Sequence, residues 1–176
     1  VIDVDNFKGV NDTLGHVYGD AVLGDMGYHL KKMSRSGDII GRVGGDEFVV
    51  FLTELPNAET ALHVAQRIGR IFHRSIEEAH IQYEITGSIG IAFYPKDGQD
   101  YLSLFSRADT AMYYAKHSGK NQLAVYDEIE ASELPLNRKE EPDEEKAGIQ
   151  KNFRDNIIEY VFRIFYENED VDIALP

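Results

Sequence analysis

Residues 42–51, with the sequence RVGGDEFVVF, place several chemically active groups at one short turn. Gly44 and Gly45 predict a tight turn, because glycine adopts backbone conformations that other residues avoid and lets a ligand approach the main chain closely. Asp46 and Glu47 follow at once, and adjacent carboxylates repel each other unless a positive group lies between them. The arrangement favours a divalent cation that carries a phosphorylated ligand; a hairpin with two solvated acids is the alternative.

A third carboxylate belongs to the first residues of the chain. Residues 1–5 (VIDVD) alternate apolar and acidic side chains and predict the end of a strand that begins upstream. In an antiparallel sheet this end can lie beside the glycine turn, so Asp3 is expected to converge with Asp46 and Glu47. Oxygen ligands clustered in this way suit Mg²⁺ or Mn²⁺ better than zinc. The alternative for Asp3 is an acid facing water, and nothing in the sequence marks Asp5 as a ligand.

Three lysines could contact phosphate groups. Lys8 follows the first strand directly, where free backbone N–H groups can meet an anion. Lys116 and Lys120 flank Gly119 at the end of a predicted helix. Lysines at that end also complement the helix dipole, which is the simpler explanation for each of them.

Asn11 and Asp20 bracket the segment NDTLGHVYGD. An amide and a carboxylate together match the hydrogen-bonding edge of guanine, since the amide both donates and accepts while the carboxylate accepts from the amino and imino groups. Turn and helix-capping roles are the alternative.

The composition limits the class of protein. The chain has 176 residues, 43% of them hydrophobic, no cysteine and a net charge of −13. It is long enough for one domain with an appendage and contains no apolar run of about 18 residues, the length needed to cross a bilayer. The negative net charge argues against binding to nucleic acid or to an anionic membrane. The lack of cysteine fits a reducing, cytoplasmic location.

The charge divides the chain into parts. Residues 1–126 carry 16 acids and 12 bases, whereas residues 127–176 carry 15 acids and 6 bases. We therefore expect a domain over 1–126, an acidic flexible linker over 127–148 and an amphipathic helix over 149–176. This helix either packs back on the domain or begins a following one, such as a GAF-like sensory domain. The first residue is not Met, which predicts a piece of a longer protein.

The hydrophobic pattern predicts the order β-α-β-β-α-β-α-β, which indicates an α/β fold with a mostly antiparallel central sheet flanked by helices. After the first strand, the expected elements are a loop over 11–19, a helix over 21–33, strands over 39–43 and 48–52, a helix from 56 to 72, a strand over 83–94, a helix over 101–116 and a strand over 122–126.

Five ordered motifs make the sequence similar to a known family. They are DVDNFKGVND at 3–12, GHVYGD at 15–20, GRVGGDEFVV at 41–50, SIGIA at 88–92 and RADTAMYYAKHSGKN at 107–121. Together they resemble the GGDEF domain family, the diguanylate cyclases that condense two GTP molecules into cyclic di-GMP and work as homodimers. The resemblance covers residues 1–126 and implies a palm-like nucleotidyl-cyclase fold and Mg²⁺ (or Mn²⁺) as cofactor.

The resemblance also implies roles for individual residues. Asp3, Asp46 and the Val4 carbonyl would hold the metal, with Glu47 contributing to the metal site or activating the 3′-hydroxyl. Asn11 and Asp20 would read guanine. The triphosphate would be held by the following groups: the main chain at Asn6, Phe7 and Lys8, the glycines Gly44 and Gly45, and the side chains of Lys116 and Lys120.

Arg35 and Asp38 form an RxxD motif at the offset of the family's product-inhibition site, and Arg67 is similar to that site's second arginine. Arginine suits the phosphates and guanine edges of cyclic di-GMP. The family often has Arg where Lys120 stands, and the chain lacks the family's upstream helix and DxLTGLxNR-type motif. A non-catalytic module that binds GTP or cyclic di-GMP is the alternative function. A cyclase for another base is the third possibility, against which the presence of Asp20 argues.

Overall fold

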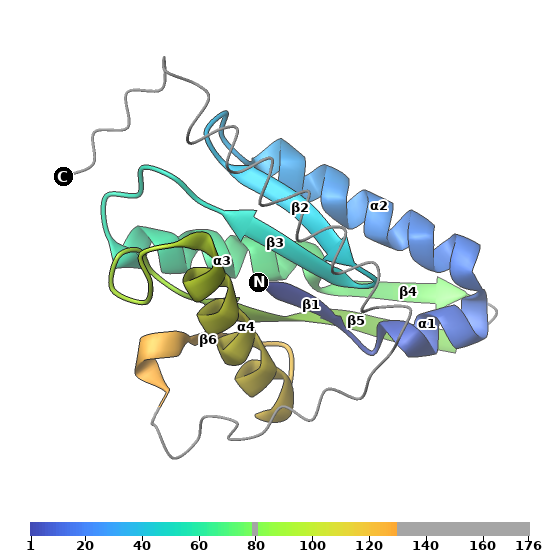
Figure 1. Cartoon of the computed structure of the whole chain (residues 1–176). Helices are drawn as coiled ribbons and strands as arrows, with labels where there is room; N and C mark the ends of the chain where they lie inside the picture. The colour runs from blue at the N-terminus through green and yellow to red at the C-terminus, as the bar shows by residue number, and fades with distance from the viewer. Residues whose placement is uncertain (79–80, 130–176) are drawn as a thin grey trace. The chain divides into compact units, whose positions relative to one another are not determined.

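The computed structural model of the chain describes residues 1–78 and 81–129 (Figure 1). Its elements are β1 Ile2–Asp5, α1 Phe7–Leu14, α2 His16–Met33, β2 Ile39–Gly44, β3 Glu47–Phe51, α3 Ala58–Phe72, β4 Arg74–Glu78, β5 Ile81–Ile91, α4 Tyr101–His117, β6 Leu123–Val125 and a final 3-10 turn at Tyr126–Glu128. Of the linker predicted over 127–148, only 127–129 are among the described residues, and the helix predicted over 149–176 lies outside them.

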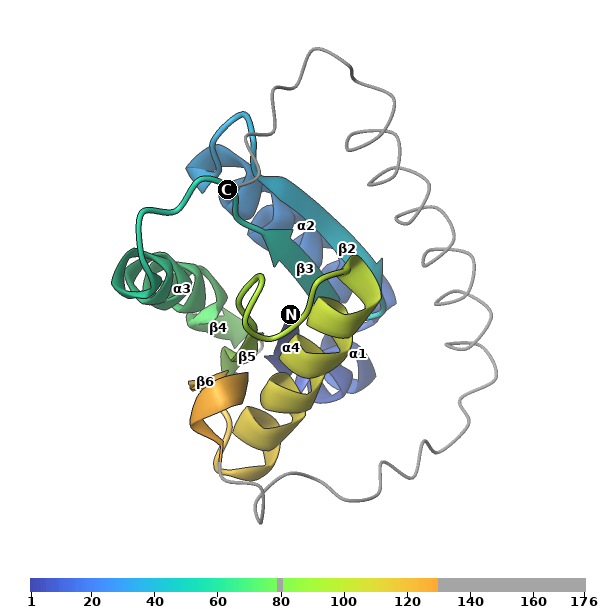
Figure 2. The same cartoon turned by 60° about the vertical axis from the view of Figure 1, so that its left-hand side comes forward.

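The strands form one six-stranded sheet in the order β2-β3-β1-β5-β4, with β6 added beside β5 (Figure 2). β1 is antiparallel to both of its neighbours, β4 is antiparallel to β5, and β6 is parallel to β5. The prediction of an α/β fold with a mostly antiparallel sheet is confirmed. β1 is central because it pairs with β3 on one side and with β5 on the other.

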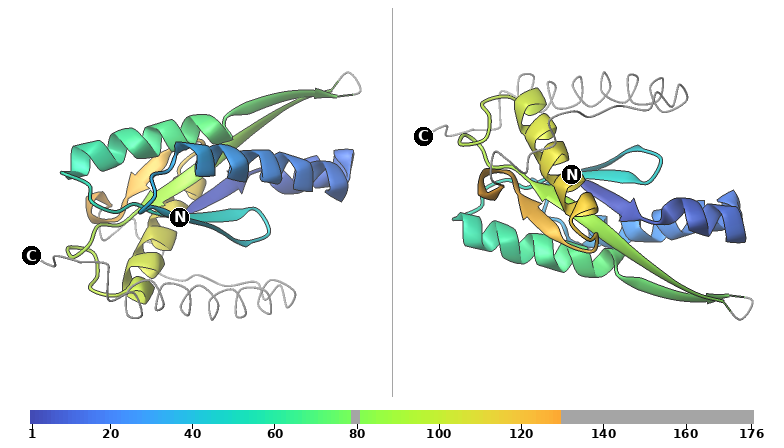
Figure 3. Two further views of the ribbon diagram at one scale, coloured as in Figure 1. Left: turned by 90° about the horizontal axis from the view of Figure 1, so that it is seen from above. Right: turned by 90° about the horizontal axis from the view of Figure 1, so that it is seen from below.

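The two faces of β1 differ in chemistry. Successive side chains of a strand point to opposite faces, so Ile2 and Val4 lie on one face and Asp3 and Asp5 on the other. The apolar pair belongs to the main hydrophobic core, together with side chains of α2 and α3. Figure 3 shows α2 and α3 on one side of the sheet and α4 on the other. The acidic face of β1 is therefore the one that α4 covers.

α4 approaches the sheet unusually closely. A Cβ atom built on Gly90 of β5 would lie 1.9 Å from the carbonyl oxygen of Ala108 and 2.1 Å from the backbone nitrogen of Met112. Only glycine fits here, because no real Cβ tolerates such distances. Ala111 and Ala115 are fully buried on the same helix. Small side chains on α4 and glycine on β5 thus let the backbones of helix and strand touch, which fixes α4 over the acidic face.

The loop predicted over 11–19 is wrong, because α1 and α2 occupy these residues. The helices are separated only by Gly15, whose φ of +85° suits glycine and whose N–H donates to the Asn11 carbonyl at 2.9 Å. Phe7 and Val10 bury the inner face of α1. The turn-forming residues of this segment suggested a loop, whereas its sparse apolar side chains have helical spacing.

β4 was not predicted from the sequence. Arg74–Glu78 (RSIEE) follows α3 almost directly and pairs with the first half of β5. Its mostly polar composition does not predict a strand from the sequence, and its pairing with β5 identifies it. None of the helices that the structure describes within residues 1–129 has both the length and the hydropathy required to span a membrane.

Candidate active site

Strand pairing brings the three predicted acids together. Asp3 lies directly opposite Glu47 in the register of β1 and β3. The N–H of Val4 donates to the Asp46 carbonyl at 3.1 Å, which places Asp46 beside the same stretch of β1. Acids that are more than forty residues apart in the sequence therefore meet at one edge of the central strand.

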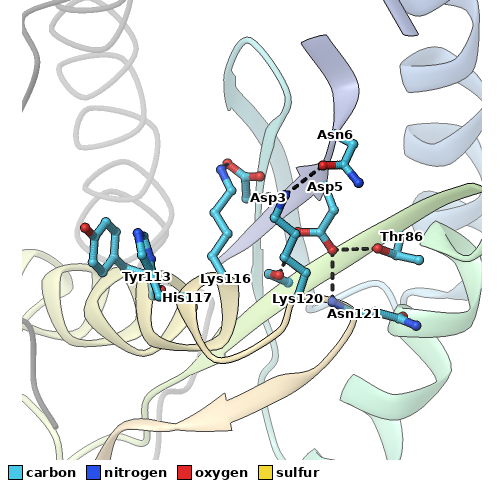
Figure 4. A network of polar contacts seen from close by, with 10 residues as sticks. Asp3, Asp5, Asn6, Thr86, Tyr113, Lys116, His117, Lys120 and Asn121 are labelled. Atoms are coloured by element: carbon cyan, nitrogen blue, oxygen red, sulfur yellow. Dashed lines mark hydrogen bonds and ion pairs between the residues drawn. The ribbon is translucent and has the colours of Figure 1, made fainter. Parts of the chain in front are cut away.

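Asp3 is buried, with 3% of its surface exposed, and its nearest cationic partner is Lys116 (Figure 4). The Lys116 Nζ atom lies 2.7 Å from the Asp3 Oδ2 atom. The other oxygen, Oδ1, is buried and has no hydrogen-bond partner among the described residues. Since a buried carboxylate oxygen without a partner is costly, this atom has a strong tendency to bind a cation.

Negative charge exceeds positive charge around Asp3. Burial raises the pKa of Asp3 most, Asp46 and Glu47 raise it further, and the Lys116 ammonium only partly opposes them, so that the pKa is about 7. Burial acts to lower the pKa of Lys116, but its hydrogen bond to Asp3 and the charges of Asp3, Asp46 and Glu47 raise it above its usual value. One ammonium thus faces three carboxylates, and an additional cation would relieve the repulsion between them.

The donor set fits a hard divalent cation. Asp3 offers a buried oxygen without a partner, and two further carboxylates lie at the adjacent strand end. Across residues 1–78 and 81–129, no three Asp, Glu or His side chains already stand at the spacing of a closed metal site. A metal would have to draw the side chains of Asp46 and Glu47 toward Asp3, or complete its ligands with phosphate oxygens and water.

Two of the predicted phosphate-binding groups, Asn6 and Lys120, meet directly after β1. Asn6 has a left-handed backbone with φ of +59° and precedes α1 without capping it through its side chain. The first N–H groups of this helix can therefore donate hydrogen bonds to a bound anion. Lys8 is exposed on α1. The Lys120 Nζ atom donates to the Asn6 Oδ1 atom at 2.7 Å. Gly44 ends β2, and Gly45, with φ of +49°, lies in the turn between β2 and β3.

Asp5 is a central residue that sequence reasoning missed. It is completely buried and accepts hydrogen bonds from Thr86, Ser88 and the N–H of Asn121 (Figure 4). The available signal was the alternation of strand residues, which places Asp5 on the same face as Asp3. Its three donors come from distant parts of the sequence and could not be identified in advance.

Asn11 and Asp20, the predicted guanine readers, lie on α1 and α2 rather than in a loop. The buried Oδ1 atom of Asn11 has no hydrogen-bond partner within the described part of the chain. It would lie only 1.9 Å from a Cβ atom on Gly19, the residue before Asp20, so the two helices meet through a glycine. Asp20 is exposed and lies 3.6 Å from Arg42. An unpaired amide oxygen close to an exposed carboxylate suits a ligand with several N–H groups.

The RxxD motif forms the turn before β2. Asp38 accepts hydrogen bonds from the N–H of Arg35 at 2.9 Å and from the N–H of Thr53 at 3.2 Å. Its carboxylate therefore fastens this turn to the end of β3. Arg35 and Arg67 are both exposed, the latter on α3. The arginines, rather than Asp38, are the groups that this geometry offers to a ligand.

The raised pKa of Asp3 predicts how stability depends on pH. Between its ordinary value of 3.8 and about 7, the folded chain retains a proton that the unfolded chain has released. The stability contributed by this proton is complete below about pH 4 and is lost as the pH rises to 7. Asp3→Asn keeps the side chain neutral, so we expect it to stabilise the metal-free protein by on the order of 2 kcal/mol at pH 8, with a smaller gain at pH 5.

Thermal unfolding in EDTA at both pH values measures this difference. Asp12→Asn, at an exposed position on α1, is the control and should change stability equally little at both. A destabilisation by Asp3→Asn of the same size at pH 5 and pH 8 would contradict the electrostatic assignment.

Comparison with known proteins agrees with this geometry. The profile of the family "Diguanylate cyclase, GGDEF domain" matches residues 1–122. Diguanylate cyclase A of Treponema denticola is 38% identical over 130 residues, which cover 71% of this chain and 34% of that protein. The chain thus spans about a third of the length of this curated relative, and still less of Biofilm architecture maintenance protein MbaA of Vibrio cholerae, of which 17% is covered.

Solved structures show the same fold. The GGDEF domain of YfiN (TpbB) from Pseudomonas aeruginosa is similar with a TM-score of 0.65 and 34% identity, covering 77% of this chain and 80% of that one. The GGDEF domain of DgcB from Caulobacter crescentus, solved in complex with c-di-GMP, has a TM-score of 0.61 and 29% identity, covering 72% of this chain and 75% of that one. With its sheet, its acidic strand end and these relatives, the chain belongs to the GGDEF domain family and has the palm-like fold of its cyclase domains.

Proposed function

We propose that the chain is an active diguanylate cyclase domain, which condenses two GTP molecules into cyclic di-GMP and releases two pyrophosphates. The observation that carries this proposal is the buried Asp3, which lies beside two further acids and keeps one oxygen without a partner. Gly44, Gly45, Asp46, Glu47 and Phe48 complete the signature that gives the family its name. The relatives named as diguanylate cyclases support the same activity.

Mg²⁺, or Mn²⁺, is the cofactor that this donor set supports. Asp3 and Asp46 would hold the ion together with the Val4 carbonyl, and Glu47 would contribute either to the metal or to the nucleophile. The bound ion supplies positive charge that orients the triphosphate and neutralises the charge that develops on it.

The other residues bind and orient GTP. The N–H groups of Asn6, Phe7 and Lys8 point out of the start of α1 and suit phosphate oxygens. Lys116 and Lys120 add positive charge beside β1, through their contacts with Asp3 and Asn6. Gly44 and Gly45 directly precede Asp46 in the sequence. Asn11 and Asp20 would read guanine by accepting its amino and imino hydrogens and donating to its carbonyl oxygen.

Each half of the reaction forms one phosphodiester. The 3′-hydroxyl oxygen of one GTP bonds to the α-phosphorus of the other, the bond from that phosphorus to the pyrophosphate oxygen breaks, and the hydroxyl proton passes to a base, for which Glu47 is the candidate. Both bonds form only when two GTP molecules face each other. We therefore propose that two copies of the domain act as a homodimer.

Incubation of the chain with GTP and Mg²⁺ at several protein concentrations tests this function. We expect cyclic di-GMP at a rate that rises faster than linearly with protein concentration, because two domains must meet. Asp46→Asn and Glu47→Gln retain the side-chain shape but remove the charge, and each should lower the rate at least about 100-fold while GTP still binds. Chromatography of the products measures the rate.

Glu59→Gln, an exposed acid at the start of α3, is the matched control and should keep the parental rate. Binding of GTP by the parent without any product would instead favour the alternative function, a non-catalytic module that binds GTP or cyclic di-GMP. Full activity of Asp46→Asn would show that the metal assignment is wrong.

Base selectivity tests the assignment of Asn11 and Asp20. Each Ala variant should reduce the preference for GTP over ATP about tenfold, since each loses about one hydrogen bond to guanine. Asp25→Ala is the control, because Asp25 lies on α2 like Asp20 and also forms surface ion pairs. Competition binding with both nucleotides measures the preference, and an unchanged ratio in both variants would refute the guanine site.

We also propose that cyclic di-GMP inhibits the domain through Arg35 and Arg67. Both guanidinium groups are exposed, and Asp38 holds the turn that carries Arg35. Arg35→Ala should raise the cyclic di-GMP concentration that halves the rate by about tenfold or more, through loss of a charged contact to phosphate. Arg70→Ala, on the same helix as Arg67, is the control. An inhibition curve that Arg35→Ala leaves unchanged would exclude this site.

A further inference from the structure

Asp5 holds together two segments that are far apart in the sequence. Its Oδ2 atom accepts from the Thr86 hydroxyl at 2.7 Å and from the Asn121 N–H at 3.0 Å, while its Oδ1 atom accepts from the Ser88 hydroxyl at 2.8 Å. Thr86 and Ser88 belong to β5, and Asn121 follows the end of α4. The carboxylate thus joins the sheet to the turn after α4 (Figure 4).

That turn has a conformation which needs external support. Gly119 has φ of +124°, and Lys120 and Asn121 have φ of +62° and +49°, so two successive residues with side chains are left-handed. Such conformations are unfavourable for residues other than glycine and persist only where the surroundings enforce them. The Lys120 N–H bonds to the Ala115 carbonyl at 3.1 Å, and the Asn121 N–H bonds to Asp5.

The backbone of Lys120 is therefore fixed at both ends, by its own N–H and by the N–H of Asn121. Its side chain extends to the Asn6 Oδ1 atom at 2.7 Å, at the start of α1. Asn6 follows Asp5 directly in the sequence. Asp5 is therefore adjacent to two of the groups that the proposed function assigns to the triphosphate: it precedes the N–H groups at Asn6–Lys8 in the sequence, and it bonds to the residue that follows Lys120.

An apolar side chain would be the simpler choice if this position served stability alone. Asp5 is 0% exposed, and its three recorded partners are uncharged donors. Burying a carboxylate is costly even when it is hydrogen-bonded, whereas apolar replacements of buried charges are often neutral or stabilising. A carboxylate at position 5 can accept from the Asn121 N–H and from β5 at the same time, which an apolar side chain cannot do.

We propose that Asp5 is a positioning residue, whose buried carboxylate holds the turn 119–121 against the sheet and so places Lys120 where it meets the substrate's phosphates. The inference rests on the proposed function, because it assumes that Lys120 contacts the triphosphate. Asp5 itself touches no substrate in this arrangement.

Binding of two probes to the full chain with Mg²⁺ tests the proposal. 3′-Deoxyguanosine triphosphate carries the phosphates but lacks the hydroxyl needed for turnover, and guanosine carries the base and the ribose without any phosphate. We expect Asp5→Ala and Lys120→Ala each to weaken binding of the triphosphate about tenfold and to leave guanosine binding unchanged. The double variant should bind within about twofold of Lys120→Ala, because both changes remove the same contact.

Three further variants separate positioning from general stability. Ser88→Ala removes a hydrogen bond from the same carboxylate but keeps the bond to Asn121, so it should bind the triphosphate like the parent. Asp5→Asn retains an oxygen that can accept from Asn121 and should restore most of the affinity. If Asp5→Ala does not fold, Asp5→Ser takes its place, since its hydroxyl can pair with Thr86 across the strands but is too short to reach Asn121.

The outcomes distinguish this inference from the proposed function. Parental binding of the triphosphate by Lys120→Ala would show that the phosphate role of Lys120 is wrong, and the inference would fail with it. Weaker binding by Lys120→Ala with parental binding by Asp5→Ala or Asp5→Ser would overturn the inference alone. Equal losses of triphosphate and guanosine, or additive losses in the double variant, would also overturn it.

Discussion

The structure depends on the burial of two acidic side chains in one short strand, β1. β1 lies in the middle of the sheet, so both of its faces are buried, yet alternate side chains are apolar and acidic. Ile2 and Val4 enter the core beneath α2 and α3 without difficulty. Asp3 and Asp5 must be buried on the opposite face, where each carboxylate requires partners. α4 and the turn after it supply part of these partners, namely Lys116 to Asp3 and the Asn121 N–H to Asp5.

The two acids meet the requirement in different ways, and the difference separates two tasks. Asp5 is surrounded by donors from β5 and the turn at 119–121. Asp3 has one lysine, two acidic neighbours and an oxygen without a partner. A carboxylate with all of its hydrogen bonds supports a structure, whereas one with remaining capacity and a raised pKa is typical of a binding site. Identical residues two positions apart therefore differ in role because of what faces them.

Much of the fold and part of the site could be predicted from the sequence. Strong periodicity predicted α3, α4, β5 and the hairpin of β2 and β3, and the apposition of Asp3 with Glu47 followed from strand pairing. The helices at 7–33 were partly missed, because turn-forming residues mask the few apolar positions of α1. The ion pair of Asp3 with Lys116 and the bonds of Asp5 could not be predicted, because they depend on how closely α4 approaches the sheet.

That approach requires Gly90, where a Cβ atom would collide with the backbone of α4. Lys116 lies on this helix, and Lys120 lies in the turn that follows it, so the position of both ammonium groups depends on one contact between a strand and a helix. A larger residue at 90 would move both charges at once, and no single substitution near the substrate could restore them. A position without any functional group thus constrains where two charged groups of the site lie.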